Sequence, residues 1–295
     1  MKSRHTLTAL MASVLVAALV SSCSNGEAGS PTATQRSEPG TAPIAQSAAM
    51  TGDRTAYQAV RFFAADGVEL VGRLSGTGDV GVILAHGFSH GTAQEGWLQF
   101  VPALVSRGYT VLTFNFRGFC DSERCSEDPS QLGKNWRDAM GAVGFMKTRG
   151  AKKIFLIGAS MGGLAVLRAA RMPEVDVSGV VSLSTPQFPS KYYTGEPRAN
   201  DVTPARLRQI DEPKLFVAGT KDVQLPGSAP LRPGVKSVQF AADARRMFDA
   251  AEEPKELALV DSSFHSSALV TTAPADIVRQ TRAAVFRFLS EHSRT

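Results

Sequence analysis

The chain has 295 residues, 43% of them hydrophobic and 20% charged, with a formal net charge of +5 at pH 7. This length and apolar content suit a protein with a sizeable core, built as one large α/β domain or two small ones, and they exclude a wholly disordered chain. Lysine and arginine are scattered along the sequence and form no stripe with interleaved aromatic residues, so we expect no nucleic-acid partner.

The N-terminus has the pattern of an export signal, predicted to cover residues 1–22. Basic residues precede an apolar run over residues 7–20, and this run is shorter than the roughly 20 residues that a membrane-spanning helix needs. Residues 20–23 read Val-Ser-Ser-Cys and resemble the lipobox of bacterial lipoproteins. This predicts that Cys23 is lipidated and anchors the exported chain to a membrane. The alternative is an ordinary cleavage site followed by a cysteine without a role.

Residues 23–55 are predicted to form a disordered tether. They are rich in Ser, Ala, Thr, Pro and Gly and contain almost no large apolar residue, so they cannot bury enough surface to fold. A flexible coil of this length has an average reach of roughly 30 Å. The folded domain is therefore predicted to cover residues 56–295 and to be held clear of the membrane surface.

Short β-rich runs alternate with longer helical patterns from about residue 57 onward. This alternation is typical of a mainly parallel sheet with helices on both faces. An Asp-Gly pair at residues 66–67 joins the first two runs and predicts an antiparallel hairpin. The sequence thus predicts an α/β fold with an eight-stranded, mostly parallel sheet. The eight strands are expected at residues 60–64, 68–74, 80–85, 110–114, 153–157, 179–183, 215–218 and 256–260.

Helical periodicity predicts five helices in the folded domain, each ending near a glycine, a proline or the chain end. Residues 186–210 contain no long periodic pattern and are too short for a full lid domain, so we expect a minimal cap. Tyr192 and Tyr193 in this stretch either line a binding site or cover the sheet edge. The helices are expected at residues 94–107, 135–149, 161–171, 238–251 and 275–291.

Residues 158–162 read Gly-Ala-Ser-Met-Gly, a Gly-x-Ser-x-Gly pattern where a predicted strand ends and a helix begins. The sharp turn needs strained backbone angles at Ser160, and the flanking glycines avoid collisions with neighbouring chain. The hydroxyl of Ser160 is thereby presented as a nucleophile, and the N–H of Met161 can point at the same reacting oxygen. The pentapeptide alone is also compatible with a purely structural turn.

A serine hydroxyl becomes a good nucleophile only when a base takes its proton. The chain has five histidines, and His265 follows the last predicted strand, where a loop can bring its imidazole over Ser160; the alternative is a surface-loop histidine. A carboxylate must hold this histidine in one tautomer and offset its positive charge. Asp222, a few residues past the seventh predicted strand, is the preferred candidate. Three other aspartates are weaker candidates: Asp261, Asp201 and Asp211.

An oxyanion needs two converging hydrogen-bond donors, and the second is expected from the loop after the third predicted strand. Residues 84–91 read Leu-Ala-His-Gly-Phe-Ser-His-Gly. Gly87 allows the backbone to turn so that the N–H of Phe88 faces the site, whereas His86 is expected to brace the loop and not to react. The alternative for this His-Gly pair is a tight turn with no catalytic part.

Two further cysteines, Cys120 and Cys125, flank a short loop and would meet an oxidising compartment after export. Either a local disulfide or two free thiols fit this spacing, because spacing alone does not fix the separation of the two Cα atoms. No group of His, Cys and carboxylate residues has metal-ligand spacing along the sequence, so we expect no metal.

Together these segments resemble the α/β-hydrolase superfamily from about residue 57 to the C-terminus, and most closely its dienelactone-hydrolase-like and serine-esterase branch. There are two departures from that branch. Ser160 replaces the cysteine of true dienelactone hydrolases, and residues 264–267 read Phe-His-Ser-Ser where Gly-His-Gly is commoner. The matching segments are residues 86–87, 116–122, 158–162, 219–222 and His265.

The resemblance implies a serine hydrolase that needs no cofactor. Its implied reaction is cleavage of small-molecule carboxylic esters of short to medium acyl chain through an acyl-enzyme on Ser160. A thioesterase, or an amidase or peptidase, could use the same residues. A third interpretation, from another class, is a non-catalytic tethered module that binds a lipid or a cell-envelope partner. The sequence gives no prediction of the oligomeric state.

Overall fold

The computed structural model describes residues 56–88, 93–121, 124–126, 133–228 and 231–294. The chain divides into two units, Met1–Ile44 and Ala45–Thr295, and the described residues all belong to the second. The predicted export signal over residues 1–22, the predicted tether over residues 23–55 and the lipid attachment expected at Cys23 lie outside the described residues.

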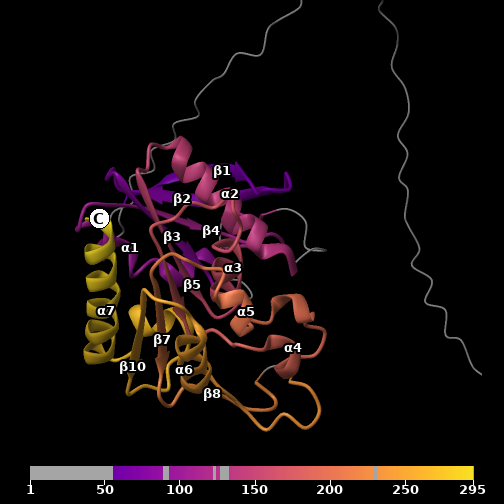
Figure 1. The fold of residues 1–295 in the computed structure, drawn as a ribbon. Helices are drawn as coiled ribbons and strands as arrows, with labels where there is room; N and C mark the ends of the chain where they lie inside the picture. The colour runs from indigo at the N-terminus through magenta and orange to yellow at the C-terminus, as the bar shows by residue number, and fades with distance from the viewer. Residues whose placement is uncertain (1–55, 89–92, 122–123, 127–132, 229–230, 295) are drawn as a thin grey trace, which may run out of the picture. The chain divides into compact units, whose positions relative to one another are not determined.

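An eight-stranded sheet runs through the described part of the chain (Figure 1). It is built from β1 (Gln58–Phe63), β2 (Glu69–Ser75), β3 (Val80–Ala85), β4 (Tyr109–Phe114), β5 (Lys153–Ala159), β6 (Gly179–Leu183), β7 (Lys214–Gly219) and β10 (Lys255–Val260). The strand order is β1-β2-β4-β3-β5-β6-β7-β10. β2 pairs antiparallel with both of its neighbours, and all other pairs in this sheet are parallel. The predicted hairpin and the predicted mostly parallel sheet are therefore confirmed.

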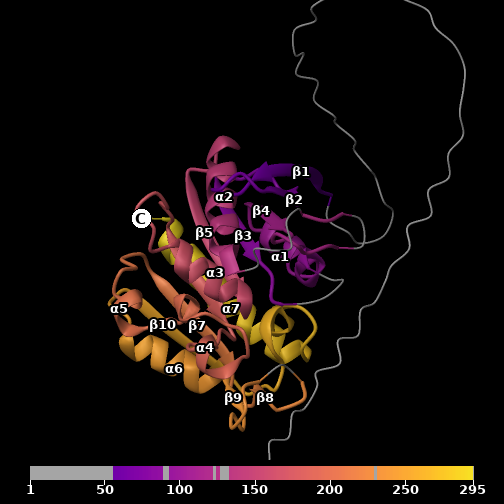
Figure 2. The same ribbon diagram turned by 90° about the vertical axis from the view of Figure 1, so that its right-hand side faces the viewer.

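Helices cover both faces of this sheet (Figures 1 and 2). One face carries α2 (Asn135–Thr148), α3 (Met161–Ala169) and α6 (Phe240–Ala250), and the other carries the 3-10 helices η1 (Gln94–Trp97) and η4 (Ser266–Val270) with α1 (Val101–Val105) and α7 (Ala275–Ser293). Met146 and Val166 belong to the core under the first face, and Trp97 and Phe288 belong to the core under the second. The central strands are buried on both sides, which is why they read as unbroken apolar runs. Within the described residues, no helix has the length and apolar content that crossing a bilayer requires.

Two predicted helices needed correction. The helix expected over residues 94–107 is wrong as a single element, because the chain forms η1 and α1 instead. Pro102 lies in the first turn of α1, where proline is accepted because its missing N–H has no intrahelical partner there. The helix expected from residue 238 begins at Phe240, because Val238–Gln239 forms β9 and pairs antiparallel with β8 (Val223–Gln224).

Residues 186–210 fold into three short helices, α4 (Pro189–Tyr192), η3 (Arg198–Asn200) and α5 (Pro204–Leu207). The hydroxyl of Tyr192 donates to Asp243 Oδ1 of α6 at 2.9 Å. The hydroxyl of Tyr193 donates to Gln224 Oε1 of β8 at 2.6 Å. The two tyrosines therefore tie this segment to α6 and to β8.

Candidate active site

Ser160 lies in a strained turn between β5 and α3. Its φ of 51° is in the left-handed region, which a residue with a side chain adopts only where the surrounding structure enforces it. A Cβ on Gly158 would lie 2.3 Å from the carbonyl oxygen of Gly162, and a Cβ on Gly162 would lie 2.2 Å from the carbonyl oxygen of Ala85. Both glycines are therefore required for the close packing of this turn, as the sequence pattern predicts.

The backbone of Ser160 is fixed on both sides. Its N–H donates to the carbonyl of Leu183 at the end of β6 (2.8 Å), and its carbonyl accepts from the N–H of Leu164 (3.2 Å), which starts the hydrogen bonding of α3. The N–H of Met161, in the first turn of α3, has no partner within the helix. This N–H group lies directly beside the serine and is not used in the hydrogen bonding of the helix.

Asp222 and His265 form a close pair. The Nδ1 atom of His265 lies 2.9 Å from Oδ2 and 3.1 Å from Oδ1 of Asp222, and the aspartate is buried. The two residues follow β7 and β10, which are parallel neighbours with Gly219 in register with Val260. This pairing makes Nδ1 the hydrogen donor of the neutral imidazole and leaves Nε2 as the acceptor.

Three further contacts hold this pair. The N–H of Lys221 donates to the carbonyl of Ser262 at 2.9 Å and joins the two loops. The ring of Phe240, at the start of α6, packs against the His265 ring with centroids 4.3 Å apart. The N–H of Phe240 also donates to the carbonyl of Asp222 at 3.2 Å. The Asp-His pair is therefore anchored by the loops after both strands and by α6.

Ser160 and the His265 loop meet at Gly87. A Cβ on Gly87 would lie 3.5 Å from Ser160 Cβ and 2.9 Å from the Oγ of Ser266, the residue after His265. Among the described residues, however, no hydrogen bond joins the Ser160 hydroxyl to His265. The structure thus brings Asp222 and His265 together, places Ser160 beside their loop and leaves the serine-histidine bond unformed. Such bonds are often long without substrate and tighten in the complex.

The alternative aspartates are occupied elsewhere or lie on the surface. Asp261 is exposed, with 73% of its side chain accessible, and pairs with Lys221. It also accepts a hydrogen bond from Thr220. Asp201 accepts hydrogen bonds from the N–H and the hydroxyl of Ser190, and Asp211 is exposed. None of the three is hydrogen-bonded to His265 among the described residues.

His86 braces the loop after β3. It is buried between the rings of Phe116 and Phe119. Its Nδ1 donates to the carbonyl of Gly87 at 2.7 Å, and its Nε2 accepts from the N–H of Phe116 at 3.0 Å. Burial lowers the pKa of His86 to about 4. The imidazole is therefore neutral at pH 7 with both nitrogens in use, which agrees with a bracing role and leaves neither nitrogen for proton transfer.

The two predicted oxyanion donors border one cavity. Phe88 and Met161 both line a cavity of about 240 Å³. The Phe88 side chain is 59% exposed, and its ring packs edge-on against Phe119 with centroids 5.6 Å apart. Phe119 thus contacts both the His86 brace and the residue whose N–H is the predicted donor.

A disulfide joins Cys120 and Cys125, with their Cα atoms 4.0 Å apart. Two hydrogen bonds continue the same narrow loop: the N–H of Asp121 donates to the carbonyl of Arg124 (2.9 Å), and the N–H of Ser126 donates to the carbonyl of Phe119 (3.0 Å). The covalent bond and these hydrogen bonds together fix the loop that carries Phe119.

A buried ionic group behind this loop was missed by the sequence reasoning. The guanidinium of Arg117 is completely buried; it donates to Asp138 of α2 at 2.8 Å and 2.5 Å, and to Asp66 in the β1–β2 hairpin at 2.6 Å and 3.1 Å. Its hydrogen bonds hold the pKa of Asp66 below its usual value. The one sign of this group in the sequence was Arg117, because it lies in residues 116–122, a segment that resembles the α/β-hydrolase superfamily. Its partners lie 51 and 21 residues away, and only the fold identifies them.

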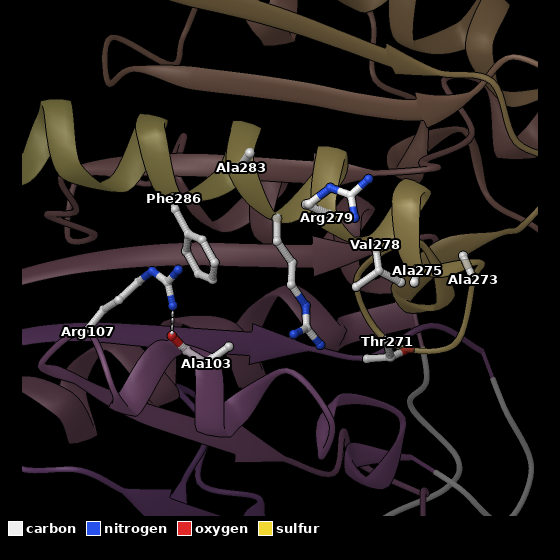
Figure 3. Close-up of a pocket in the computed structure, with 10 residues that line it drawn as sticks. Ala103, Arg107, Thr271, Ala273, Ala275, Val278, Arg279, Ala283 and Phe286 are labelled. Atoms are coloured by element: carbon white, nitrogen blue, oxygen red, sulfur yellow. Dashed lines mark hydrogen bonds between the residues drawn. The ribbon is translucent and has the colours of Figure 1, made fainter.

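A larger cavity lies apart from these residues. It measures about 630 Å³ and is bordered by α1 and α7, with Arg107 of the loop after α1 facing Phe286 of α7 (Figure 3). The Arg107 guanidinium lies 3.7 Å from the centre of the Phe286 ring and donates to the carbonyl of Ala103 at 2.7 Å. None of the candidate catalytic residues lines this cavity, so it plays no part in the site described above.

Among the described residues, one group of possible metal ligands also forms, at the opposite ends of the strands. Glu256 near the start of β10 lies close to Glu291 and His292 at the end of α7, with ligand atoms within 4.8 Å of one another. Sequence spacing did not predict this group, because strand and helix residues meet only in the fold. Arg287 lies in the same place and donates to Glu256 at 2.6 Å, so a guanidinium already pairs with one of the two carboxylates.

Comparison with known proteins places the chain in a family. A model described as the alpha/beta hydrolase family matches residues 82–292. This match covers more than half of the chain, and the protein belongs to the alpha/beta hydrolase family.

The chain is similar in part of its sequence to an epoxide hydrolase and in its fold to solved structures that include esterases. A stretch of 108 residues is 32% identical to epoxide hydrolase A of Mycobacterium tuberculosis and covers 37% of this chain and 32% of that protein; the match thus spans about a third of the relative's length. The fold is similar to an esterase of Pyrococcus furiosus, with a TM-score of 0.60 and 21% identity over 80% of this chain and 91% of that one. It is equally similar to Est1E of Butyrivibrio proteoclasticus with ferulic acid bound, at a TM-score of 0.60 and 15% identity over 80% and 100%.

Proposed function

We propose that this protein is a serine hydrolase that cleaves carboxylic esters of short to medium acyl chain through an acyl-enzyme on Ser160. The observation that carries the proposal is the left-handed turn at Ser160 beside a formed Asp222–His265 pair. Esterases among the structures that share this fold support the choice of bond.

The reaction uses only these residues and water. His265 Nε2 takes the proton of Ser160 as Oγ bonds to the ester carbonyl carbon, while Asp222 stabilises the imidazolium. The N–H groups of Phe88 and Met161 hold the oxyanion. His265 returns the proton to the departing alcohol, and a water molecule activated by the same imidazole then releases the acid. Closure of the serine-histidine bond accompanies substrate binding.

The nucleophile decides between an ester and an epoxide. Attack of a serine on an epoxide would leave an ether on the enzyme, which water does not cleave under the same catalysis. Attack on an ester leaves an acyl-enzyme that water does cleave. Ser160 therefore supports ester hydrolysis, although epoxide hydrolase A is a relative over part of the chain.

The first test is covalent labelling of the nucleophile. A fluorophosphonate probe is expected to label the native protein and to leave Ser160→Ala unlabelled. Equal labelling of both proteins would refute the proposal. Matched ester, thioester and amide substrates with one acyl group then separate an esterase from a thioesterase or an amidase. Binding of an acyl ligand without turnover, unchanged in Ser160→Ala, would instead identify a non-catalytic binding module.

The second test uses two aspartates as a matched pair. Asp222→Asn is expected to lower kcat on the order of 10³- to 10⁴-fold, because the histidine then loses its preferred tautomer and its counter-charge. Asp261→Asn is expected to leave kcat unchanged, because that side chain is exposed and paired with Lys221. Equal effects of the two substitutions would contradict the assignment of Asp222.

We also infer that the chain is exported and anchored through Cys23. The Cys120–Cys125 disulfide supports export, because disulfides persist mainly in oxidising compartments. The protein is expected in the membrane fraction of a lipoprotein-processing bacterium, and Cys23→Ser is expected to move it to the soluble fraction. Membrane attachment that survives this substitution would contradict the anchor.

A further inference from the structure

The cavity next to Phe88 and Met161 is placed to hold the acyl part of the substrate, and this inference rests on the proposed function. It has a volume of about 240 Å³, and no residue of the Asp222 or His265 loops lines it. In ester cleavage the histidine protonates the leaving alcohol, so the alcohol lies on the histidine side. A cavity beside the oxyanion donors but away from the histidine therefore receives the acyl group.

The cavity extends along α3. Met161, Leu164 and Arg168 line it at helical spacing, and Arg168 follows Met161 by about 10 Å along the helix axis. The guanidinium of Arg168 is held at the cavity by Asn200 and Trp136, which line it too. The volume equals about eight water molecules at roughly 30 Å³ each. An acyl chain of about that many non-hydrogen atoms fits.

Arg168 places a positive charge at the wall of the cavity, and no carboxylate of the described residues pairs with it. Its Nη1 donates to the amide oxygen of Asn200 at 3.2 Å, and its guanidinium lies 4.6 Å from the centre of the Trp136 ring. No carboxylate lies within ion-pairing distance of Arg168 among the described residues. Burial, and then repulsion by Arg206 and Arg137, lower the pKa of Arg168, so the neighbouring charges are of the same sign.

One carboxylate also borders the cavity. Glu196 accepts a hydrogen bond from the amide nitrogen of Asn200 at 2.8 Å, so Asn200 stands between Glu196 and Arg168. A half-buried cation without an ion partner gains from an anion supplied by a ligand.

A second polar group points to the same conclusion. Asn135 lines the cavity and is buried. Among the described residues, its amide nitrogen donates to Met161 Sδ at 3.2 Å, and sulfur is a weak acceptor. A ligand carboxylate can accept hydrogen bonds from this amide nitrogen and from Arg168, whereas an apolar acyl chain offers neither group an acceptor.

We propose that the acyl group carries a carboxylate at its far end and that this carboxylate binds Arg168, so that the substrates are monoesters of short dicarboxylic acids. The carboxylate accepts two N–H bonds from the guanidinium in the bidentate geometry that arginine favours. The ester carbonyl at the other end of the acyl chain lies against Phe88 and Met161. Arg168 is then a specificity-determining residue that takes no part in bond breaking.

Three 4-nitrophenyl esters of similar length test this proposal. They are the hemiglutarate, whose end group is a carboxylate, the 5-methylhexanoate, its neutral isostere, and the 5-aminopentanoate, whose end group is cationic. The native protein is expected to prefer the hemiglutarate over the neutral isostere by about 10- to 100-fold in kcat/KM, as for other charge-assisted hydrogen bonds. The cationic ester is expected to be the poorest substrate.

Variants of α3 then identify the residue responsible. Arg168→Gln is expected to remove the preference mainly by raising KM for the hemiglutarate, while hydrolysis of the neutral isostere changes less than about threefold and shows that the protein is folded. Arg168→Lys is expected to keep part of the preference. Arg171→Gln is the matched control, because Arg171 lies just past the end of α3, bonds to Gln209 and does not line the cavity.

Each contrary result has a distinct meaning. The native protein could hydrolyse the neutral isostere through Ser160, so that Ser160→Ala abolishes the activity, and yet show no preference for the hemiglutarate. That result overturns this inference and leaves the proposed function standing. A preference for the cationic ester overturns it in favour of Glu196. A preference that survives Arg168→Gln, or that Arg171→Gln removes equally, overturns the role of Arg168. Failure to hydrolyse any of the three esters, with no labelling of Ser160, counts against the proposed function itself.

Discussion

The buried imidazole of His86 makes a quantitative prediction for stability against pH. Burial holds its pKa at about 4 in the folded protein, below the ordinary value of 6.5. In the unfolded chain the same group takes up a proton as the pH falls below 6.5. The unfolded state therefore binds more protons between pH 6.5 and pH 4, and the free energy of unfolding falls as the pH falls through that window.

The size of the effect follows from the pKa difference. A difference of about 2.5 pKa units corresponds to roughly 3 kcal/mol in full, and about 2 kcal/mol of it is lost by pH 5. His86→Gln removes the titrating group, and its side-chain oxygen can still accept the N–H of Phe116. The stability difference between the native protein and this variant is expected to shrink by about 2 kcal/mol from pH 8 to pH 5.

Urea unfolding at a series of pH values measures this difference. Other titrating groups contribute equally to both proteins and cancel in the comparison. A stability difference that is the same at pH 8 and pH 5 would refute the reasoning and would mean that water or a counter-charge reaches the imidazole in the folded state.

The remaining predictions concern the loop and the helix beside this brace. Reduction of the Cys120–Cys125 disulfide, or its replacement by two serines, is expected to lower the free energy of unfolding by about 2 kcal/mol through loop entropy, which thermal unfolding with and without reductant measures. Gly144→Ala in α2 is expected to stabilise the protein by about 0.5–1 kcal/mol, because nothing lies within 4 Å of the new Cβ and alanine favours the helix. Gly141→Ala on the same helix is expected to destabilise it, because its Cβ would lie 2.3 Å from the carbonyl oxygen of Phe63; similar melting temperatures for the two variants would contradict this account.

The strands could be predicted because a strand that is buried on both faces appears in the sequence as an unbroken apolar run. The unbroken apolar run that became β5 and the Asp-Gly pair between β1 and β2 have few other interpretations. The helix expected over residues 94–107 failed for a local reason. Its apolar positions do repeat with helical spacing, but Pro102 can stand only at a helix start.

The candidate site, too, could be predicted from the sequence only in part. Asp222 and His265 could be chosen from the sequence because each follows a strand, and the carboxyl ends of parallel strands share one edge of the sheet. The positions of two buried or half-buried arginines, Arg117 and Arg168, could not be predicted. Arg117 contacts Asp66 because the β1–β2 hairpin brings Asp66 to it. The position of Arg168 beside the cavity depends on the packing of α2 against α3.

The order of the residues along the chain has a consequence for synthesis. The turn that presents Ser160 is built from β5, β6 and α3, whereas Asp222 and His265 depend on β7, β10 and α6, which leave the ribosome later. A nascent or clipped chain that stops before residue 265 would carry the serine without its proton acceptor. Under the mechanism that we propose, such a chain is expected to stay inert toward the cell's own esters until His265 has been added after β10.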